Sequence, residues 1–62
     1  MKYSELEKIL REQGCDFHHN GANHPIWKST ITGRIFPMSH HRNQDVKHGT
    51  LKSILTASGA KI

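Results

Sequence analysis

Six histidines are spread through the 62-residue sequence, and their positions raise the question of whether any of them does chemistry. His24 follows the stretch "NGAN", so it is expected where a turn enters a β-strand. A side chain in that place is held by the sheet and still reaches solvent. Because histidine titrates near neutral pH, an imidazole there can accept or donate a proton. His24 is therefore the first candidate for a catalytic residue.

RNA is a substrate on which a single histidine can begin a reaction. It carries its own nucleophile, the 2′-hydroxyl beside the scissile phosphate, and a positioned base contributes roughly 10²–10⁴-fold in rate. Cationic side chains would hold the phosphates, and Lys28, Arg34 and Arg42 are candidates for that role. The alternative is that His24 is an ordinary surface residue of a histidine-rich chain.

Two adjacent histidine pairs, His18–His19 and His40–His41, suggest a metal site. Adjacent residues of a β-strand point to opposite faces, so neither pair is expected to chelate an ion as a strand pair. A site built from His24, His41 and one carboxylate stays an alternative. No Cys–His spacing resembles a zinc module, so we expect no metal and no cofactor.

The stretch "KHGTLKS" places Lys47, His48 and Lys52 around the start of a predicted helix. Backbone N–H groups at a helix start favour an anion, so a phosphate is one expected ligand. A solvated helix start with Thr50 as an ordinary cap is the other interpretation. Cys15 has no cation beside it in the sequence and is expected to be a small buried hydrophobe rather than a nucleophile.

The charge balance favours a polyanionic partner. Nine Lys and Arg residues against five Asp and Glu residues give a net charge of +4, which suits nucleic acid better than a membrane. One cysteine excludes an intramolecular disulfide and suits a reducing compartment. No apolar run is long enough for a signal peptide or a membrane helix. We expect a cytoplasmic protein with no membrane contact, consisting of one domain over residues 1–62.

Two stretches are predicted to be helical, 4–13 and 50–58, the second with a start at 50 or a few residues earlier. Ser4 and Glu7 predict a capping box at the first, and a glycine follows each stretch. The carboxylates of the first helix are expected on a solvated face. Each stretch carries apolar residues at i, i+3 and i+4: Leu6, Ile9 and Leu10 in the first, and Leu51, Ile54 and Leu55 in the second.

Three stretches between the helices are predicted to be strands, 15–20, 24–31 and 34–38. The turn signals "NG" and "TG" separate them, which predicts an antiparallel meander. Proline cannot donate a ladder hydrogen bond, so Pro25 is expected at a strand start and Pro37 at an edge or a strand end.

The buried face of the middle strand can be assigned in two ways. With Trp27 in the core, Pro25 and Ser29 share its side, and His24, Ile26 and Lys28 face out. With Ile26 in the core, the side chain of His24 is on the same side and points toward the core. We favour Trp27, because burying its large ring contributes more than burying a smaller side chain.

The resulting order is α-β-β-β-α. Two helices with one apolar face each need an apolar surface to cover, and one face of a three-stranded sheet supplies it. The predicted fold is an α+β two-layer sandwich, with an antiparallel three-stranded sheet and two helices on one face. This is the order of elements found in double-stranded-RNA-binding domains.

The motifs together resemble the HicA family of toxins from type II toxin–antitoxin systems, also called the YcfA-like family. The resemblance covers nearly the whole chain. It rests on "SELEKILREQG", on "NGANH" with the basic strand after it, and on "HGTLKSILTASGAKI". Gly49 to Leu55 fit the closing helix of that family residue by residue.

The resemblance implies a fold similar to double-stranded-RNA-binding domains and an mRNA interferase, an endoribonuclease that inhibits translation and growth. It also implies silencing by a HicB-like antitoxin in a heteromeric assembly. The catalytic histidine of the family follows a glycine turn, usually as Gly-Ser-His, and the matching residue is His24. Gly21 and Asn23 then belong to the turn that positions it, with Ala22 in place of the usual serine.

We expect mRNA as the substrate, contacted by a set of basic residues, with Lys28 or His41 as assistants of His24. A non-catalytic module that binds duplex RNA by shape is the alternative, and metal storage by the histidines is a third possibility. The expected RNA-binding residues are Lys28, Arg34, His41, Arg42 and Lys52.

Overall fold

Two helices and three strands follow one another in the predicted order α-β-β-β-α, which confirms the α+β fold class. The structure, a computed structural model, describes residues 1–62. The elements are α1 (Tyr3–Glu12), β1 (Cys15–Asn20), β2 (Pro25–Ser29), β3 (Ile35–Pro37) and α2 (His48–Ser58).

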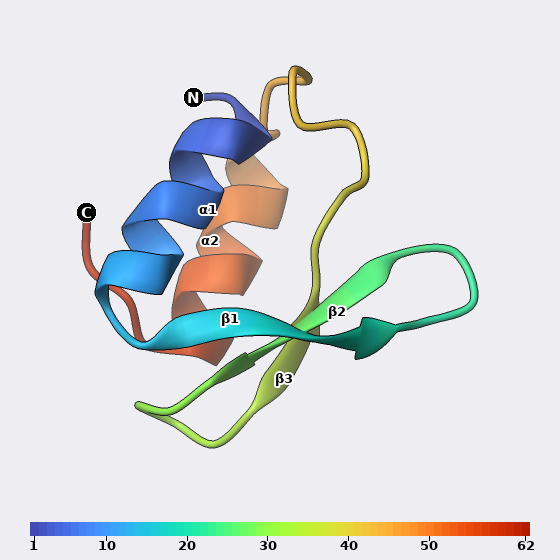
Figure 1. Ribbon diagram of the computed structural model, residues 1–62. Coiled ribbons are helices and arrows are strands. Elements are labelled where there is room, and N and C mark those ends of the chain that lie inside the picture. The colour runs from blue at the N-terminus through green and yellow to red at the C-terminus, as the bar shows by residue number, and fades with distance from the viewer.

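The three strands form one antiparallel sheet in the order β1-β2-β3. The two helices lie side by side on one face of this sheet, and the β1–β2 hairpin projects beyond them (Figure 1). Pro25 begins β2, and Pro37 ends the edge strand β3, as predicted for residues that cannot donate a ladder bond.

The helix-facing side of the sheet carries Trp27, which is only 3% exposed. Pro25 and Ser29 are buried on the same side, whereas Lys28 is exposed, so the assignment of Trp27 to the core is confirmed. Phe36 pairs with Trp27 across the strands and is buried with it. The core is completed by Tyr3, Leu6, Leu10, Cys15, Met38, Val46, Ile54 and Ala60.

The start of α1 differs from the prediction. Lys2, not Ser4, is the residue that precedes the helix, and the Lys2 backbone N–H donates to the Glu5 carboxylate at 3.4 Å. The backbone N–H groups of Tyr3 and Ser4 donate to carbonyls of residues 44 and 42. Because this distant loop satisfies the first donors, the helix begins one residue early, and the Ser4–Glu7 capping box is wrong.

Glu7 does not lie on the solvated face that was predicted for the carboxylates of the first helix. It is 7% exposed, and its two carboxylate oxygens lie 3.5 Å from Arg11 Nη1 and 3.2 Å from Arg42 Nε. The 3.6-residue period puts Glu7 beside the apolar stripe, and only the folded loop after β3 supplies the second arginine. Glu7 therefore ties α1 to that loop.

Strand β2 ends at Ser29, two residues before the predicted end. The Ser29 hydroxyl accepts hydrogen bonds from the backbone N–H groups of Ile31 and Thr32, at 3.0 and 3.3 Å, and so bends the chain into a turn. The same fully buried hydroxyl donates to the Ser58 carbonyl at 2.5 Å. One side chain thus stops the strand and attaches the turn to the end of α2.

Helix α2 begins at His48, earlier than residue 50, and ends at Ser58, with Gly59 (φ +71°) as its C-cap. Lys47 precedes the helix, so Thr50 lies inside the first turn and the interpretation of Thr50 as the cap is wrong. Neither helix has the length and apolar character needed to cross a membrane.

Candidate functional site

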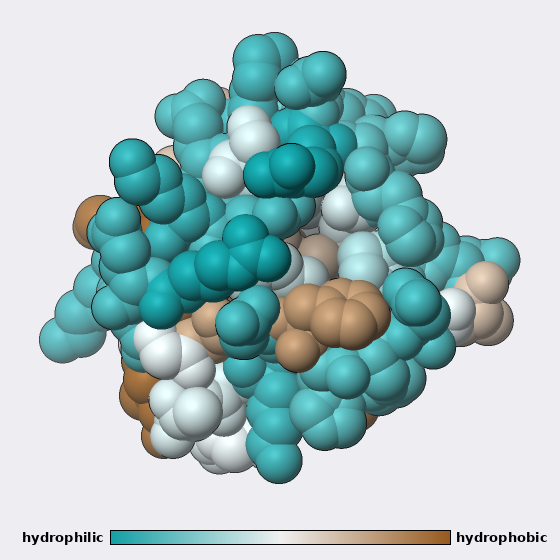
Figure 2. Space-filling model, viewed as in Figure 1, coloured by the Kyte–Doolittle hydropathy of each residue, from teal (hydrophilic) through white to brown (hydrophobic).

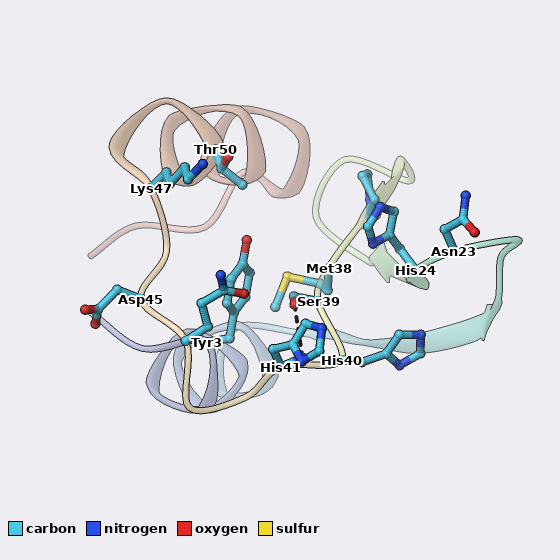
Figure 3. A pocket seen from close by; sticks show the side chains of 12 residues that line it. Tyr3, Asn23, His24, Met38, Ser39, His40, His41, Asp45, Lys47 and Thr50 are labelled. Atoms are coloured by element: carbon cyan, nitrogen blue, oxygen red, sulfur yellow. Dashed lines mark hydrogen bonds between the residues drawn. The ribbon is translucent and has the colours of Figure 1, made fainter.

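A cavity of about 410 Å³ opens beside the start of α2 and brings together residues from four segments of the chain. Figure 3 shows these side chains arranged around it. Among them are Asn23 and His24 from the β1–β2 turn, His40 and His41 from the loop after β3, Tyr3 from the start of α1, and Lys47 and Thr50 from the start of α2.

His24 is held through its backbone while its side chain stays exposed. The Gly21 backbone N–H donates to the His24 carbonyl at 2.9 Å and closes the turn. A Cβ atom at position 21 would lie 3.0 Å from the His24 carbonyl oxygen and 3.0 Å from Ile26 Cγ1. A side chain at position 21 would therefore force the His24 carbonyl or Ile26 to move by a few tenths of an ångström, and the backbone at His24 is anchored by this turn.

His41 reaches the cavity from a loop rather than a strand. Its backbone N–H donates to the Ser39 hydroxyl at 3.0 Å, the one hydrogen bond drawn between the cavity residues in Figure 3. The Met38 backbone N–H donates to the Pro25 carbonyl at 2.9 Å, which ties the start of this loop to the strand that follows His24. The structure thus brings His24, Asn23 and His41 to one cavity.

The four remaining basic candidates lie elsewhere. Arg34 and Lys52 line a second depression of about 370 Å³ together, and Arg42 lines a third of about 230 Å³. Lys28 pairs with Asp16 and Ile35 across the strands, on the sheet face that the helices leave open. The predicted set is therefore divided among several parts of the surface.

The third depression lies next to the cavity and is lined by aromatic and charged residues. Phe17 is 46% exposed there, and Figure 2 shows an apolar patch over β1, the strand that carries it, within a mostly hydrophilic surface. Arg11 Cζ lies 4.9 Å from the centroid of the Trp27 ring. Arg11 and Arg42 both pair with the one Glu7 carboxylate, so two positive charges face one negative charge in this depression.

Asp16 is the one titratable group with a clear shift. The Phe17 backbone N–H, 2.7 Å from the carboxylate, and then the Arg11 guanidinium lower the pKa of Asp16 from its usual 3.8. The folded state therefore gains stability from Asp16 above pH 3.8 and loses it as the pH falls through the lowered pKa. Since the side chain is exposed, this contribution is small.

The expected opposite orientation of His18 and His19 is wrong. The register slips by one residue between Phe17 and His19, so His19 lies opposite Ile26 and His18 has no partner of its own across the strands. The two imidazoles meet, with 2.7 Å between the Nδ1 atoms. A β-bulge of this kind puts two neighbouring side chains on one side of the strand. No group of three or more His, Cys, Asp or Glu residues is arranged to hold a metal ion.

Cys15 is 1% exposed, which confirms the expectation of a small buried hydrophobe. Tyr3 is not among the site residues predicted from the sequence, although it lies at the start of α1 and lines the cavity. No signal in its neighbourhood separates it from an ordinary core tyrosine, because its proximity to His24 arises from packing alone.

A known protein family matches nearly the whole length of the chain. Residues 3–60 match the sequence model of the family described as HicA toxin of bacterial toxin-antitoxin. The chain belongs to the HicA toxin family. No curated protein and no solved structure matches it. A HicA toxin is the toxin of a toxin–antitoxin pair, so an antitoxin partner is implied.

Proposed function

We propose that this HicA toxin is a metal-independent endoribonuclease that cleaves mRNA, with His24 as its catalytic residue. The observation that carries the proposal is the exposed His24 side chain at a 410 Å³ cavity that also contains His41 and Lys47. Two proton-transfer groups and a cation around one cavity can supply a general base, a general acid and a charge for the phosphate in cleavage next to a 2′-hydroxyl. Family membership supports the same reaction class.

The proposed reaction uses the nucleophile of the substrate. His24 accepts the proton of the 2′-hydroxyl, the 2′-oxygen attacks the adjacent phosphorus, and the bond from phosphorus to the 5′-oxygen breaks. The departing oxygen takes a proton from a second imidazole. His41 is the candidate for this step because it lines the same cavity, whereas Lys28 lies on the open face of the sheet. The reverse assignment of acid and base uses the same two groups.

The basic residues outside the cavity would bind phosphates farther along the strand of RNA. Arg34 and Lys52 line one depression and can act on one phosphate together. Arg42 keeps a 62% exposed side chain in spite of its pair with Glu7, so its guanidinium still has donors to offer. The net charge of +4 favours the approach of RNA in the same way.

The test of the proposal is a cleavage assay with the purified protein. Labelled mRNA incubated in excess chelator should be cut at the same rate as without chelator, because the 2′-hydroxyl and the imidazoles need no metal-bound water. RNA that is retarded in a gel but stays intact would instead identify a module that binds duplex RNA. Cleavage that stops with chelator and returns with a divalent cation would contradict metal independence.

Gly21→Ala tests how His24 is positioned. The added Cβ must displace the His24 carbonyl or Ile26 by a few tenths of an ångström. Because misplacing a catalytic group by about 1 Å can cost on the order of 10²-fold, we expect cleavage to slow by roughly 3–30-fold. Initial rates at saturating RNA measure the effect.

The matched control is Ala22→Ser, a change of similar size at the next, exposed position of the same turn. It should leave the cleavage rate within about twofold, as exposed substitutions usually do. Equal losses in the two variants would show that the turn is merely sensitive to change, and the close approach at Gly21 would then have no special role.

The antitoxin partner follows from the family, and we propose that it is HicB-like. An antitoxin that covers the cavity would shield His24 from RNA and bury part of the basic surface. An acidic partner surface would suit the net charge of the toxin. The two proteins would then form a heteromeric complex in which the toxin is inactive.

A further inference from the structure

The first backbone N–H groups of α2 have no hydrogen-bond acceptor within the protein. Lys47 precedes the helix without any side-chain cap, and the first turn has no acidic residue. The first backbone bond into the helix runs from the Leu51 N–H to the Lys47 carbonyl, so the N–H groups of His48, Gly49 and Thr50 have no partner in the chain. The start of α1 is different, because loop carbonyls and Glu5 accept from its first N–H groups.

A second polar group is aimed at this place. Tyr3 is 92% buried, since 8% of its surface is exposed, yet its hydroxyl takes part in none of the side-chain hydrogen bonds of the chain. No side-chain polar atom sealed from solvent lacks a partner, so this hydroxyl must reach the cavity surface. Figure 3 shows it pointing into the cavity, toward the side where Lys47 and Thr50 lie.

The charges around the hydroxyl favour an anion. Lys47, which precedes α2, and Thr50 of its first turn line the cavity. Asp45 is the one carboxylate that lines it, and Figure 3 shows its oxygens turned away from the Tyr3 hydroxyl at the outer edge. A phenol, an ammonium and Thr50, whose backbone N–H is unpaired, line one cavity, and these groups match the oxygens of a phosphate group.

We propose that Tyr3, Lys47 and the start of α2 form a phosphate-binding subsite for the RNA strand, in the same cavity as His24. This inference rests on the proposed ribonuclease function, and it identifies the ligand as a phosphodiester of the substrate. Tyr3 donates its hydroxyl to a phosphate oxygen, and Lys47 adds its charge. The subsite holds the strand so that a 2′-hydroxyl lies at His24, which makes Tyr3 a positioning residue.

Tyr3→Phe is the deciding variant, because it keeps the buried ring and removes only the hydroxyl. The variant is made in a His24→Ala background so that RNA is not consumed. We expect it to bind a labelled single-stranded RNA roughly tenfold more weakly at a salt concentration of about 0.15 M, the value of one hydrogen bond to a charged group. The melting temperature should be unchanged, since the hydroxyl has no partner in the protein.

Two lysine variants separate a local contact from net charge. Lys47→Gln and Lys8→Gln lower the charge equally, but Lys8 is an exposed residue of α1 that lines none of the three depressions. Lys47→Gln should weaken RNA binding clearly more than Lys8→Gln. In addition, inorganic phosphate should shift the amide NMR signals of residues 48–50 saturably, and less so in Tyr3→Phe.

Unchanged RNA affinity in Tyr3→Phe, or equal effects of the two lysine variants, would overturn the subsite. Phosphate-induced shifts that avoid residues 48–50 would overturn it as well. Failure of the ribonuclease proposal has a different signature, because His24→Ala alone would then still cut RNA. The two results are therefore read from separate measurements on the same set of proteins.

Discussion

Replacing His24 by alanine is expected to slow RNA cleavage by roughly 10²–10⁴-fold, the range for loss of one general acid or base. The side chain is exposed, and the hydrogen bond from Gly21 reaches the His24 backbone carbonyl, so the turn keeps its anchor in the variant. The melting temperature should therefore stay close to that of the parent protein. RNA affinity should change much less than the rate, because the basic residues remain.

The measurement is a cleavage assay under single-turnover conditions, together with growth of cells that express each variant. His19→Ala is the matched control, since His19 is an exposed histidine on β1 that lines none of the three depressions. It should cut RNA at the parent rate and arrest growth as the parent does. If His24→Ala keeps more than a tenth of the activity, His24 is not the catalytic residue.

Trp27→Ala is expected to have the largest effect on stability. The ring is 3% exposed, packs beside Phe36 and lies under the Arg11 guanidinium. Loss of a buried tryptophan costs about 3–5 kcal/mol, against a total of about 3–9 kcal/mol for a chain of this length. We expect the melting temperature to fall by roughly 15–30 °C, which thermal denaturation followed by circular dichroism measures.

Ile35→Ala is the comparison for this result. Ile35 lies in the same sheet, but it is 55% exposed and faces away from the helices. Its replacement should cost about 1 kcal/mol or less, mainly through lower strand propensity. Similar losses at Trp27 and Ile35 would mean that both faces of the sheet contribute equally, and the assignment of the core to the Trp27 face would be incorrect.

Much of the fold could be predicted from short stretches of the sequence. The apolar spacing of Leu6 and Leu10 located α1, and the turn signals placed the three strands within two residues of their observed bounds. The ends of elements were harder to predict. The start of α1 depends on carbonyls of residues 42 and 44, and the end of β2 depends on a serine that contacts the last residue of α2.

The alternation rule failed at one place, for a reason that no pattern in β1 discloses. Side chains alternate only while two strands stay in register. Between Phe17 and His19 the register shifts by one residue, and two histidines expected on opposite faces meet instead. The shift is a property of the pairing between β1 and β2 and of the turn that joins them, and not of the β1 sequence alone.

For the candidate site, the sequence by itself determined the turn that presents His24, the basic composition and, through motif resemblance, the family. These properties depend on short stretches of residues or on their total number, so they can be predicted without the tertiary structure. Only the tertiary structure decided that Tyr3, His24, His41 and Lys47 share one cavity, and that the other basic residues lie outside it. The approach of residues up to 44 positions apart is decided by packing of the whole core, which no short stretch of sequence encodes alone.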